Sequence, residues 1–252
     1  MRLERREFKY LLAAETVELF RRSLAPYCIL DPMCAQRPDH RYTIDSLYLD
    51  TTDRQLYASN DLELPRRFKA RVRTYPDNAD APAYLEIKAR DGDIIYKTRG
   101  AVPKEDVAAL LEKPPHRVHD PNLERFFSLR LRHNLAPVCL VRYQREAWVS
   151  QLDPYTRVTF DTHIRHQRME QWCLQSDPRQ WRSNDAAPLT QNGGVRSPTI
   201  LELKFERAVP GWLSRLVARW DLDRRAFSKY GTAMKAMLAP PEHRTSDGRL
   251  AP

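Results

Sequence analysis

Strict alternation between apolar and charged residues constrains this chain more than any other feature of its sequence. From 67 to 75 every even position is apolar or small, and every odd position is a cation except for the final tyrosine. Residues 83–90 alternate in the same way, and the Asp91-Gly92-Asp93 turn signal joins them to 94–102 as a hairpin. A period of two places successive side chains on opposite faces of a strand. Tight turns between such strands predict an antiparallel sheet rather than a parallel sheet with crossover helices.

The rest of the chain is divided among short elements of one domain. A length of 252 residues suits one large domain, which we place at 1–239, with a disordered tail at 240–252. The pattern predicts further strands at 1–10, 42–50, 138–150, 155–161 and 199–205, and a weak strand near 167–174. It predicts helices at 14–25, 104–112, 122–133, 211–220 and 223–238, and a short helix after Thr51-Thr52-Asp53.

The net charge of +9 and the pI of about 9.5 favour a polyanionic partner: nucleic acid, an anionic membrane or a phosphate compound. The excess is mostly arginine, whose planar guanidinium forms two parallel hydrogen bonds with phosphate. The four cysteines, Cys28, Cys34, Cys139 and Cys173, form no CxxC pair and have no spacing that suits zinc. Because the N-terminus is charged and no apolar run approaches about 18 residues, we expect a soluble cytoplasmic protein with reduced thiols.

The charged faces of the predicted strands repeat the same few residue types. They carry Glu7, Lys9, Arg71, Arg73, Glu86, Lys88, Arg90, Lys97, Arg99, Arg142, Arg157, Glu202 and Lys204. In one interpretation these are solvated outer faces of a basic sandwich. In the other they line the interior of a barrel, where cations a few Å apart would repel one another unless an anion lay between them. The glutamates then act either as cross-strand ion-pair partners or as ligands of a divalent ion that arrives with phosphate.

Nine short motifs occur in a fixed order and resemble one known domain. They are E-x-K-Y at 7–10, Y-x-D-T at 48–51, R-x-R-x-Y at 71–75, E-x-K at 86–88, K-x-R at 97–99, R-x-x-R at 142–145, R-x-T-x-D at 157–161, E-x-K at 202–204 and S-K-Y at 228–230. This order is similar to that of the VTC domain, the polyphosphate polymerase domain of the vacuolar transporter chaperone family, which also occurs as stand-alone bacterial proteins. That family belongs to the triphosphate tunnel metalloenzymes, with the CYTH adenylate cyclases and thiamine triphosphatases. The resemblance covers about residues 4–238.

The resemblance implies an α+β fold, an eight-stranded antiparallel β-barrel tunnel with flanking helices and a C-terminal closing helix. It implies that Glu202 binds a metal, Mn²⁺ or Mg²⁺, with Glu7 and Glu86 as further candidate ligands. It implies catalytic roles for Ser228, Lys229, Arg71, Arg73 and Lys88. The implied phosphate-binding residues are Lys9, Arg71, Arg73, Lys88, Arg142, Arg157 and Lys229, and Lys97, Arg99 and Lys204 are expected as additional interior cations.

One position departs from the wider superfamily. CYTH enzymes begin with E-x-E-x-K, whereas this chain reads R-x-E-x-K, with Arg5 at the first position. The loss of a carboxylate and the gain of a cation favour a tunnel that holds polyphosphate over a two-metal hydrolase or cyclase. Any metal then depends more heavily on Glu202.

The predicted function is metal-dependent transfer of the γ-phosphate of ATP to a growing polyphosphate chain. Two alternatives remain: a tripolyphosphatase or other triphosphate hydrolase of the same fold, and a non-catalytic module that binds polyphosphate or nucleic acid. Tyr75, Tyr84 and Tyr96 could serve as base-stacking platforms, but tyrosines at strand ends are more often core or rim residues, so nucleic acid is not the expected partner. A membrane-surface role is least favoured because no basic amphipathic helix stands out. The sequence does not identify a membrane protein that would receive the product.

Overall fold

The computed structural model describes residues 5–92, 94–183, 189–191, 194–196, 199–225 and 227–239. The predicted tail at 240–252 lies outside these residues, as does the side chain of Arg5. Ten strands form one antiparallel sheet and two form a small hairpin, β10–β11. The strands are β1 (Arg5–Leu12), β2 (Cys28–Leu30), β3 (Tyr42–Asp50), β4 (Arg66–Thr74), β5 (Ala83–Asp91), β6 (Ile94–Val102), β7 (Ala136–Ser150), β8 (Arg157–Arg168), β9 (Arg182–Ser183), β10 (Leu189–Gln191), β11 (Gly194–Arg196) and β12 (Thr199–Glu206).

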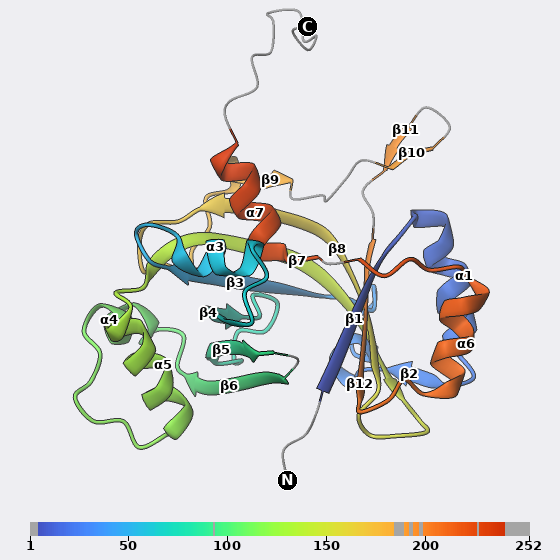
Figure 1. The fold of residues 1–252 in the computed structure, drawn as a ribbon, viewed down its shortest axis with the longest axis horizontal. Helices are drawn as coiled ribbons and strands as arrows, with labels where there is room; N and C mark the ends of the chain where they lie inside the picture. Colours follow the sequence, from blue (N-terminus) through green and yellow to red (C-terminus); the bar gives the residue numbers. More distant parts are fainter. Residues whose placement is uncertain are drawn as a thin grey trace, which may run out of the picture.

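Helices flank this sheet on both sides and above it (Figure 1). They are α1 (Ala14–Leu24), α2 (Pro32–Ala35), α3 (Gln55–Asp61), α4 (Val107–Glu112), α5 (Pro121–Arg132), α6 (Gly211–Arg219), α7 (Lys229–Leu238) and the 3₁₀ turn η1 (Pro178–Gln180). No helix within the described ranges combines the length and the apolar character that crossing a membrane requires.

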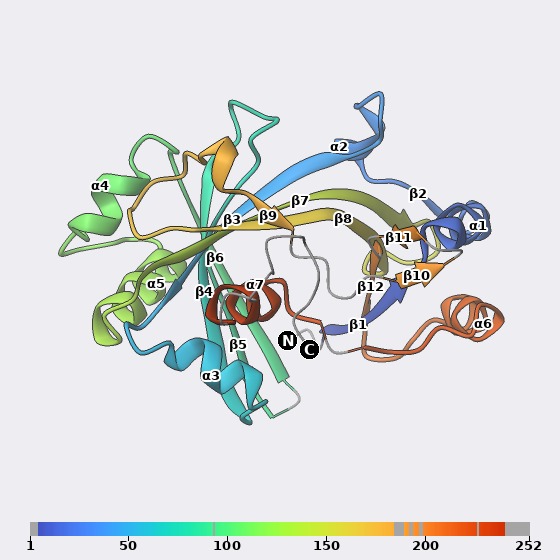
Figure 2. The same cartoon turned by 90° about the horizontal axis from the view of Figure 1, so that it is seen from above.

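Eight strands follow one another in the order β1-β12-β8-β7-β3-β4-β5-β6 and curve strongly (Figure 2). The predicted strand number along this path is therefore met, but the predicted closed barrel is wrong, because β1 and β6 are not hydrogen-bonded neighbours. The start of β3 pairs with β7 at Arg145, and β2 pairs with the last residues of β7. β1 and β6 come close to each other at the two ends of the path, but among the described residues no hydrogen-bonded ladder joins them.

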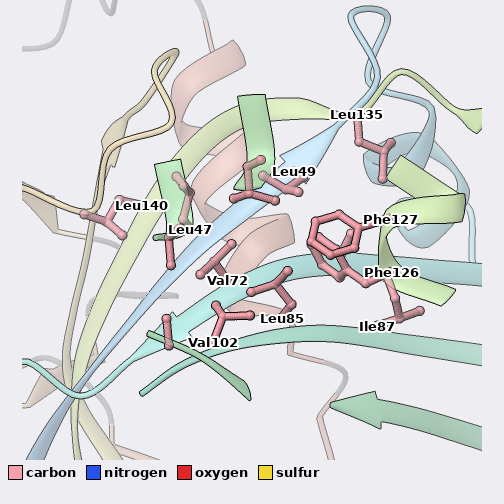
Figure 3. Packing of buried hydrophobic residues seen from close by; sticks show 14 of the residues in the cluster. Leu47, Leu49, Val72, Leu85, Ile87, Val102, Phe126, Phe127, Leu135 and Leu140 are labelled. Atoms are coloured by element: carbon pink, nitrogen blue, oxygen red, sulfur yellow. The ribbon is translucent and has the colours of Figure 1, made fainter. Parts of the chain in front are cut away.

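The two faces of the curved sheet bury different cores. On the outer face of β3 to β6, a core that includes Leu47, Leu49, Val72 and Leu85 packs against α4 and α5. Phe126 and Phe127 of α5 lie over these residues (Figure 3). A second outer core joins β1, β8 and β12 to α1 and α6. On the inner face, α7 packs its Tyr230 and Met234 against β3 and β7. In Figure 2, α7 accordingly lies between the two halves of the sheet, whereas α1, α4, α5 and α6 lie outside it.

The last helix is shorter than the pattern 223–238 predicts. It begins at Lys229, after the Ser228 N-cap, because the preceding residues pair with β1 instead of coiling. Arg224 bridges to Tyr10, and the backbone N–H of Arg225 donates to the carbonyl of Lys9 at 2.9 Å. The weak strand predicted near 167–174 is the end of β8, which stops at Arg168, and the sequence analysis did not anticipate β2, α2 or β9.

Candidate functional site

The charged face of the alternating strands is the inner face of the sheet. In the β4-β5-β6 register, Arg71, Glu86 and Arg99 are direct cross-strand neighbours, so their side chains share one face. On the other half of the sheet, Glu7 lies opposite Lys204, and Lys9 opposite Glu202. We call the charged side chains that meet here the inner-face network. It consists of Glu7, Lys9, Lys69, Arg71, Arg73, Glu86, Lys88, Lys97, Arg99, Arg145, Asp161, Glu202, Lys204 and Lys229.

Glu86 is the centre of one cluster within this network. Its carboxylate is 1% exposed and lies 2.7 Å from Arg71, 2.7 Å from Lys97, 3.3 Å from Arg99 and 3.8 Å from Arg73. Burial alone would raise the pKa of Glu86, but the positive charges of Arg71, Arg73 and Lys97 outweigh it and hold that pKa well below the usual range. Glu86 is therefore an ionised counter-ion that keeps four cations close together.

Glu202 is the centre of a second cluster. Its carboxylate, buried on β12, lies 2.8 Å from Lys204, 2.9 Å from Lys229, 3.1 Å from Arg145 and 3.5 Å from Lys9. Burial again opposes ionisation, and the surrounding cations, Lys204 and Lys229 foremost, lower the pKa of Glu202 well below its ordinary value. The four cations come from β1, β7, β12 and α7, so this cluster ties the two ends of the chain together.

Asp161 of β8 completes the second cluster. Arg145 donates two parallel hydrogen bonds of 2.7 Å to its carboxylate, and the ammonium of Lys229 lies 2.6 Å away. Burial raises the pKa of Asp161, but Arg145 and Lys229 reverse this effect and lower it. Burial alone would lower the pKa of Lys229. The carboxylates of Asp161 and Glu202 raise that pKa above its ordinary value, so Lys229 stays charged.

The N-terminus of α7 enters the network from the side opposite the sheet. Ser228 caps the helix by accepting from the N–H of Gly231 at 3.0 Å, and its hydroxyl also accepts from Lys69 at 2.9 Å. Lys9 donates to the carbonyl of Phe227 at 2.9 Å. The predicted role of the S-K-Y motif at a closing helix is consistent with this position, because Ser228 and Lys229 are both directed at the charged inner face.

The Y-x-D-T motif and the S-K-Y motif meet in one hydrogen bond, between Asp50 and Tyr230. Asp50, the aspartate of Y-x-D-T, is completely buried and accepts from the backbone N–H groups of Leu56 and Tyr57 at 2.8 and 2.9 Å, which holds the start of α3. The hydroxyl of Tyr230, the tyrosine of S-K-Y, donates to the same carboxylate. Asp50 and Tyr230 thus fix α7 relative to β3 and α3 and place Lys229 beside Glu202.

Across the open side of the sheet, one ion pair joins the two halves directly. Glu7 of β1 lies 3.2 Å from Lys88 of β5, and its carboxylate also lies 3.2 Å from Lys9. Burial raises the pKa of Glu7, but Lys88 and Lys9 lower it far more. The side chains expected to line an open tunnel therefore contact one another.

Arg142 does not join the network, and its expected place in a shared cavity is wrong. It forms a bidentate pair with Asp45 at 2.6 and 2.7 Å on the outer face, and its guanidinium lies 4.9 Å from the ring centre of Trp181. The β3–β7 pairing runs without a shift from Arg145 to Cys139. Ordinary alternation therefore places Arg142 and Arg145, three residues apart, on opposite faces of β7, and Arg145 takes the inward position.

Arg157 lies at the margin of the network. It is exposed, and it is the cross-strand neighbour of Lys204, so it shares the face of the second cluster at its solvent side. No ion pair of Arg157 is found among the described residues. The contact of Arg157 with a phosphate chain stays a prediction.

The carboxylates do not form a ready metal site. Among the described residues, no three His, Cys, Asp or Glu side chains are grouped so that they could hold a metal ion. Glu86 belongs to one cluster, while Glu7 and Glu202 belong to the other side of the network, where Lys9 lies between them. Both oxygens of Glu202 already contact ammonium or guanidinium groups. The donor set thus does not fit an ion held by the protein alone.

Several network members were not among the predicted site residues. Lys69 continues the period of Arg71 and Arg73 and could have been included on that basis. Arg145 and Asp161 stood inside quoted motifs without an assigned role. Tyr48 and Tyr143 carry no charge, so the alternation did not mark them, yet their hydroxyls lie 3.1 Å from Arg71 and 3.3 Å from Arg73.

Comparison with known proteins gives a consistent result at the level of family. Residues 4–238 match the VTC domain. No curated protein sequence is similar enough to count as a match.

Three solved structures share parts of the shape at low identity. A proposed adenylate cyclase from Bacillus halodurans is 12% identical, with a TM-score of 0.48, covering 88% of this chain and 92% of its own. A proposed adenylate cyclase from Vibrio parahaemolyticus is also 12% identical, with a TM-score of 0.46, covering 93% and 99%. The PH1819 protein from Pyrococcus horikoshii is 8% identical, with a TM-score of 0.44, covering 93% and 99%. At these scores the likeness does not extend to function.

Proposed function

The chain belongs to the VTC domain family, and on that premise we propose that it transfers the γ-phosphate of ATP to the end of a polyphosphate chain on the inner face of its sheet. One observation carries the proposal. The inner-face network brings ten cationic side chains together with four carboxylates, a formal excess of six positive charges. Such an excess in a partly buried region favours a ligand with many closely spaced negative charges.

The arrangement suits phosphoryl transfer, which needs positioning and charge neutralisation more than covalent chemistry. Arg71 and Arg73 extend from β4 with planar donor groups that match phosphate oxygens. Lys229 enters from α7, where Asp161 and Glu202 keep it protonated. In the proposed reaction an oxygen of the terminal chain phosphate bonds to the γ-phosphorus, the bond to the β–γ bridging oxygen breaks, and ADP leaves. Lys229 and Ser228 would contact the group in transfer, while Arg71, Arg73 and Lys88 hold the remaining phosphates.

A requirement for Mn²⁺ or Mg²⁺ is part of the proposal but not of the geometry. Because the described carboxylates are already occupied by cations, the ion would arrive with the phosphates of ATP. Chelation with EDTA should then abolish turnover while tripolyphosphate still binds. Retained turnover without divalent ions would remove the metal from the proposal. An ATP-using protein whose Cys28, Cys34 and Cys139 are free thiols is proposed to work in the cytoplasm.

The decisive experiment is incubation of the purified protein with ATP and Mn²⁺ or Mg²⁺, followed by gel electrophoresis and ³¹P NMR. Internal phosphate resonances that grow with ADP support the polymerase. Free orthophosphate without chain products would instead assign a hydrolase of the same fold. Binding of tripolyphosphate without any turnover would leave a binding module. Lys235→Ala is a matched control, because Lys235 lies on the same helix as Lys229 but is exposed and paired with Asp61.

A further inference from the structure

Three lysines form a row across adjacent strands of the inner face. Lys69 of β4 lies directly opposite Lys88 of β5, which lies directly opposite Lys97 of β6. Like charges that face each other across strands are destabilising. Lys88 is compensated by Glu7 at 3.2 Å, and Lys97 by Glu86 at 2.7 Å. Lys69 has no carboxylate partner among the described residues, and its ammonium contacts the neutral hydroxyl of Ser228.

The strands around Lys69 present positive charge to it. Lys9 faces it from β1, Lys88 from β5, and Arg67 and Arg71 flank it on β4. Ser228 of α7 supplies a hydroxyl, and Lys229 next to it is committed to Asp161 and Glu202. Across the open side, the carboxylate of Glu7 is shared by Lys9 and Lys88. Burial and then Lys9, Lys88 and Arg71 lower the pKa of Lys69 to about 7.

We propose that Lys69 couples occupancy of the site to proton uptake: a phosphate chain replaces Ser228 as its partner, and the amine takes up a proton as the chain binds. The inference rests on the proposed function and deepens it, because it names the residue that senses the bound phosphate. An anion beside an amine favours the ammonium form and therefore raises its pKa. Binding of the chain and protonation of Lys69 must then assist each other by linkage.

The coupling makes the affinity for a phosphate chain depend on pH. Below pH 7 Lys69 is already charged in the empty site, so binding needs no additional proton there. Above pH 7 the empty site holds a neutral amine, so binding draws a proton from solvent, and this contribution to affinity weakens as the pH rises further. An arginine at position 69 stays charged throughout this range, so it keeps the charge but cannot show the proton linkage.

The test is calorimetric titration with tripolyphosphate at pH 8 in Tris and in HEPES, whose ionisation enthalpies differ. The difference in measured enthalpy gives the number of protons taken up per chain bound. Wild-type protein should take up about one proton more than Lys69→Arg. Subtracting the proton number of Lys69→Arg from that of wild type cancels the protons that the phosphate itself releases on binding. Lys69→Met should show the lower proton number of the arginine variant, together with at least about tenfold weaker binding. Lys235→Met should match wild type in both.

The outcomes distinguish the role of Lys69 from the ability of the protein to bind phosphate. Equal proton numbers for wild type, Lys69→Arg and Lys69→Met would overturn the role of Lys69 while leaving phosphate binding intact. Absence of tripolyphosphate binding in wild type would overturn the proposed function itself. The methionine variant gives the same proton comparison if the bulkier arginine proves to unfold the protein, which a thermal melt of each variant shows directly.

Discussion

The Glu86 and Glu202 clusters look alike in composition, since each surrounds one buried glutamate with four cations, but they are assembled differently. The Glu86 cluster is local, because its cations all come from the neighbouring strands β4 and β6, and two of them, Lys97 and Arg99, are 40% and 37% exposed. The Glu202 cluster draws on β1, β7, β12 and α7, and Lys229 is only 7% exposed. Two cations of the first cluster can therefore turn toward solvent, whereas the second cluster joins strands and a helix that are far apart in the sequence.

Glu202→Gln should have the largest effect of all. It leaves Lys9, Arg145, Lys204 and Lys229 without their central carboxylate in a buried region, which should cost roughly 3–5 kcal/mol of stability. Turnover should fall at least about 100-fold, because Lys229 loses one of the two groups that position it. Thermal melts and ATP turnover measure the two effects. If it melts like wild type, the Glu202 cluster is not a structural element.

Lys229→Ala should come second. Loss of its ammonium should reduce turnover at least about tenfold if it contacts the transferred phosphoryl group. Because Asp161 and Glu202 lose a buried partner, stability should also fall, by roughly 3 kcal/mol. Steady-state rates with ATP, compared with Lys235→Ala, provide the measurement. Wild-type rates in the alanine variant would limit α7 to packing.

Glu86→Gln should act in the opposite direction on binding. The amide keeps the shape but removes the charge that competes with phosphate for Arg71 and Arg73, so tripolyphosphate affinity should rise by about threefold to tenfold. Lys97 and Arg99 can turn to water, so the stability loss should be smaller than for Glu202→Gln, on the order of 1–3 kcal/mol. Titration calorimetry decides the sign. Weaker binding in Glu86→Gln would show that Glu86 organises the site rather than competing within it.

Arg142→Met should have the smallest effect on activity. Arg142 faces the outer side of the sheet, so turnover should stay within about twofold, although Asp45 loses its partner and stability drops by roughly 1–3 kcal/mol. Arg145→Met is the matched contrast, because it lies three residues away on the inner face and should lose at least about tenfold in turnover. Equal rates for the two variants would contradict the assignment of Arg142 and Arg145 to opposite faces of β7.

These two arginines also show how far sequence reasoning reaches. The period of two assigned Arg71, Glu86 and Lys97 to one face correctly, because regular strands preserve that period. It failed at Arg142, because alternation gives Arg142 and Arg145 opposite faces but does not show which of the two faces is the inner one. The start of α7 was missed for another reason. The backbone from Arg224 pairs with β1, a long-range contact that overrides local helical periodicity.

Whether the sheet closes into a barrel could not be predicted from the sequence either. Each strand and its neighbour leave a local pattern of alternation and turn residues, but whether the first and last strands meet depends on curvature summed over all eight. The carboxylates illustrate the same limit within the site. Alternation placed Glu7, Glu86 and Glu202 on the inner face, but it could not show that each would be surrounded by cations rather than grouped around a metal.

If the chain makes the polymer proposed above, the unpaired edges of β1 and β6 would affect how that polymer is released. In a closed barrel, a bound linear polymer is surrounded by backbone on all sides and can leave only by sliding out end first. In this fold no backbone ladder completes the ring, and the Glu7–Lys88 ion pair is the contact that directly bridges β1 and β5 among the described ion pairs. Breaking that pair costs far less than breaking a strand ladder. On the proposed function, a polymer with both ends held elsewhere would therefore be released sideways, without a free end.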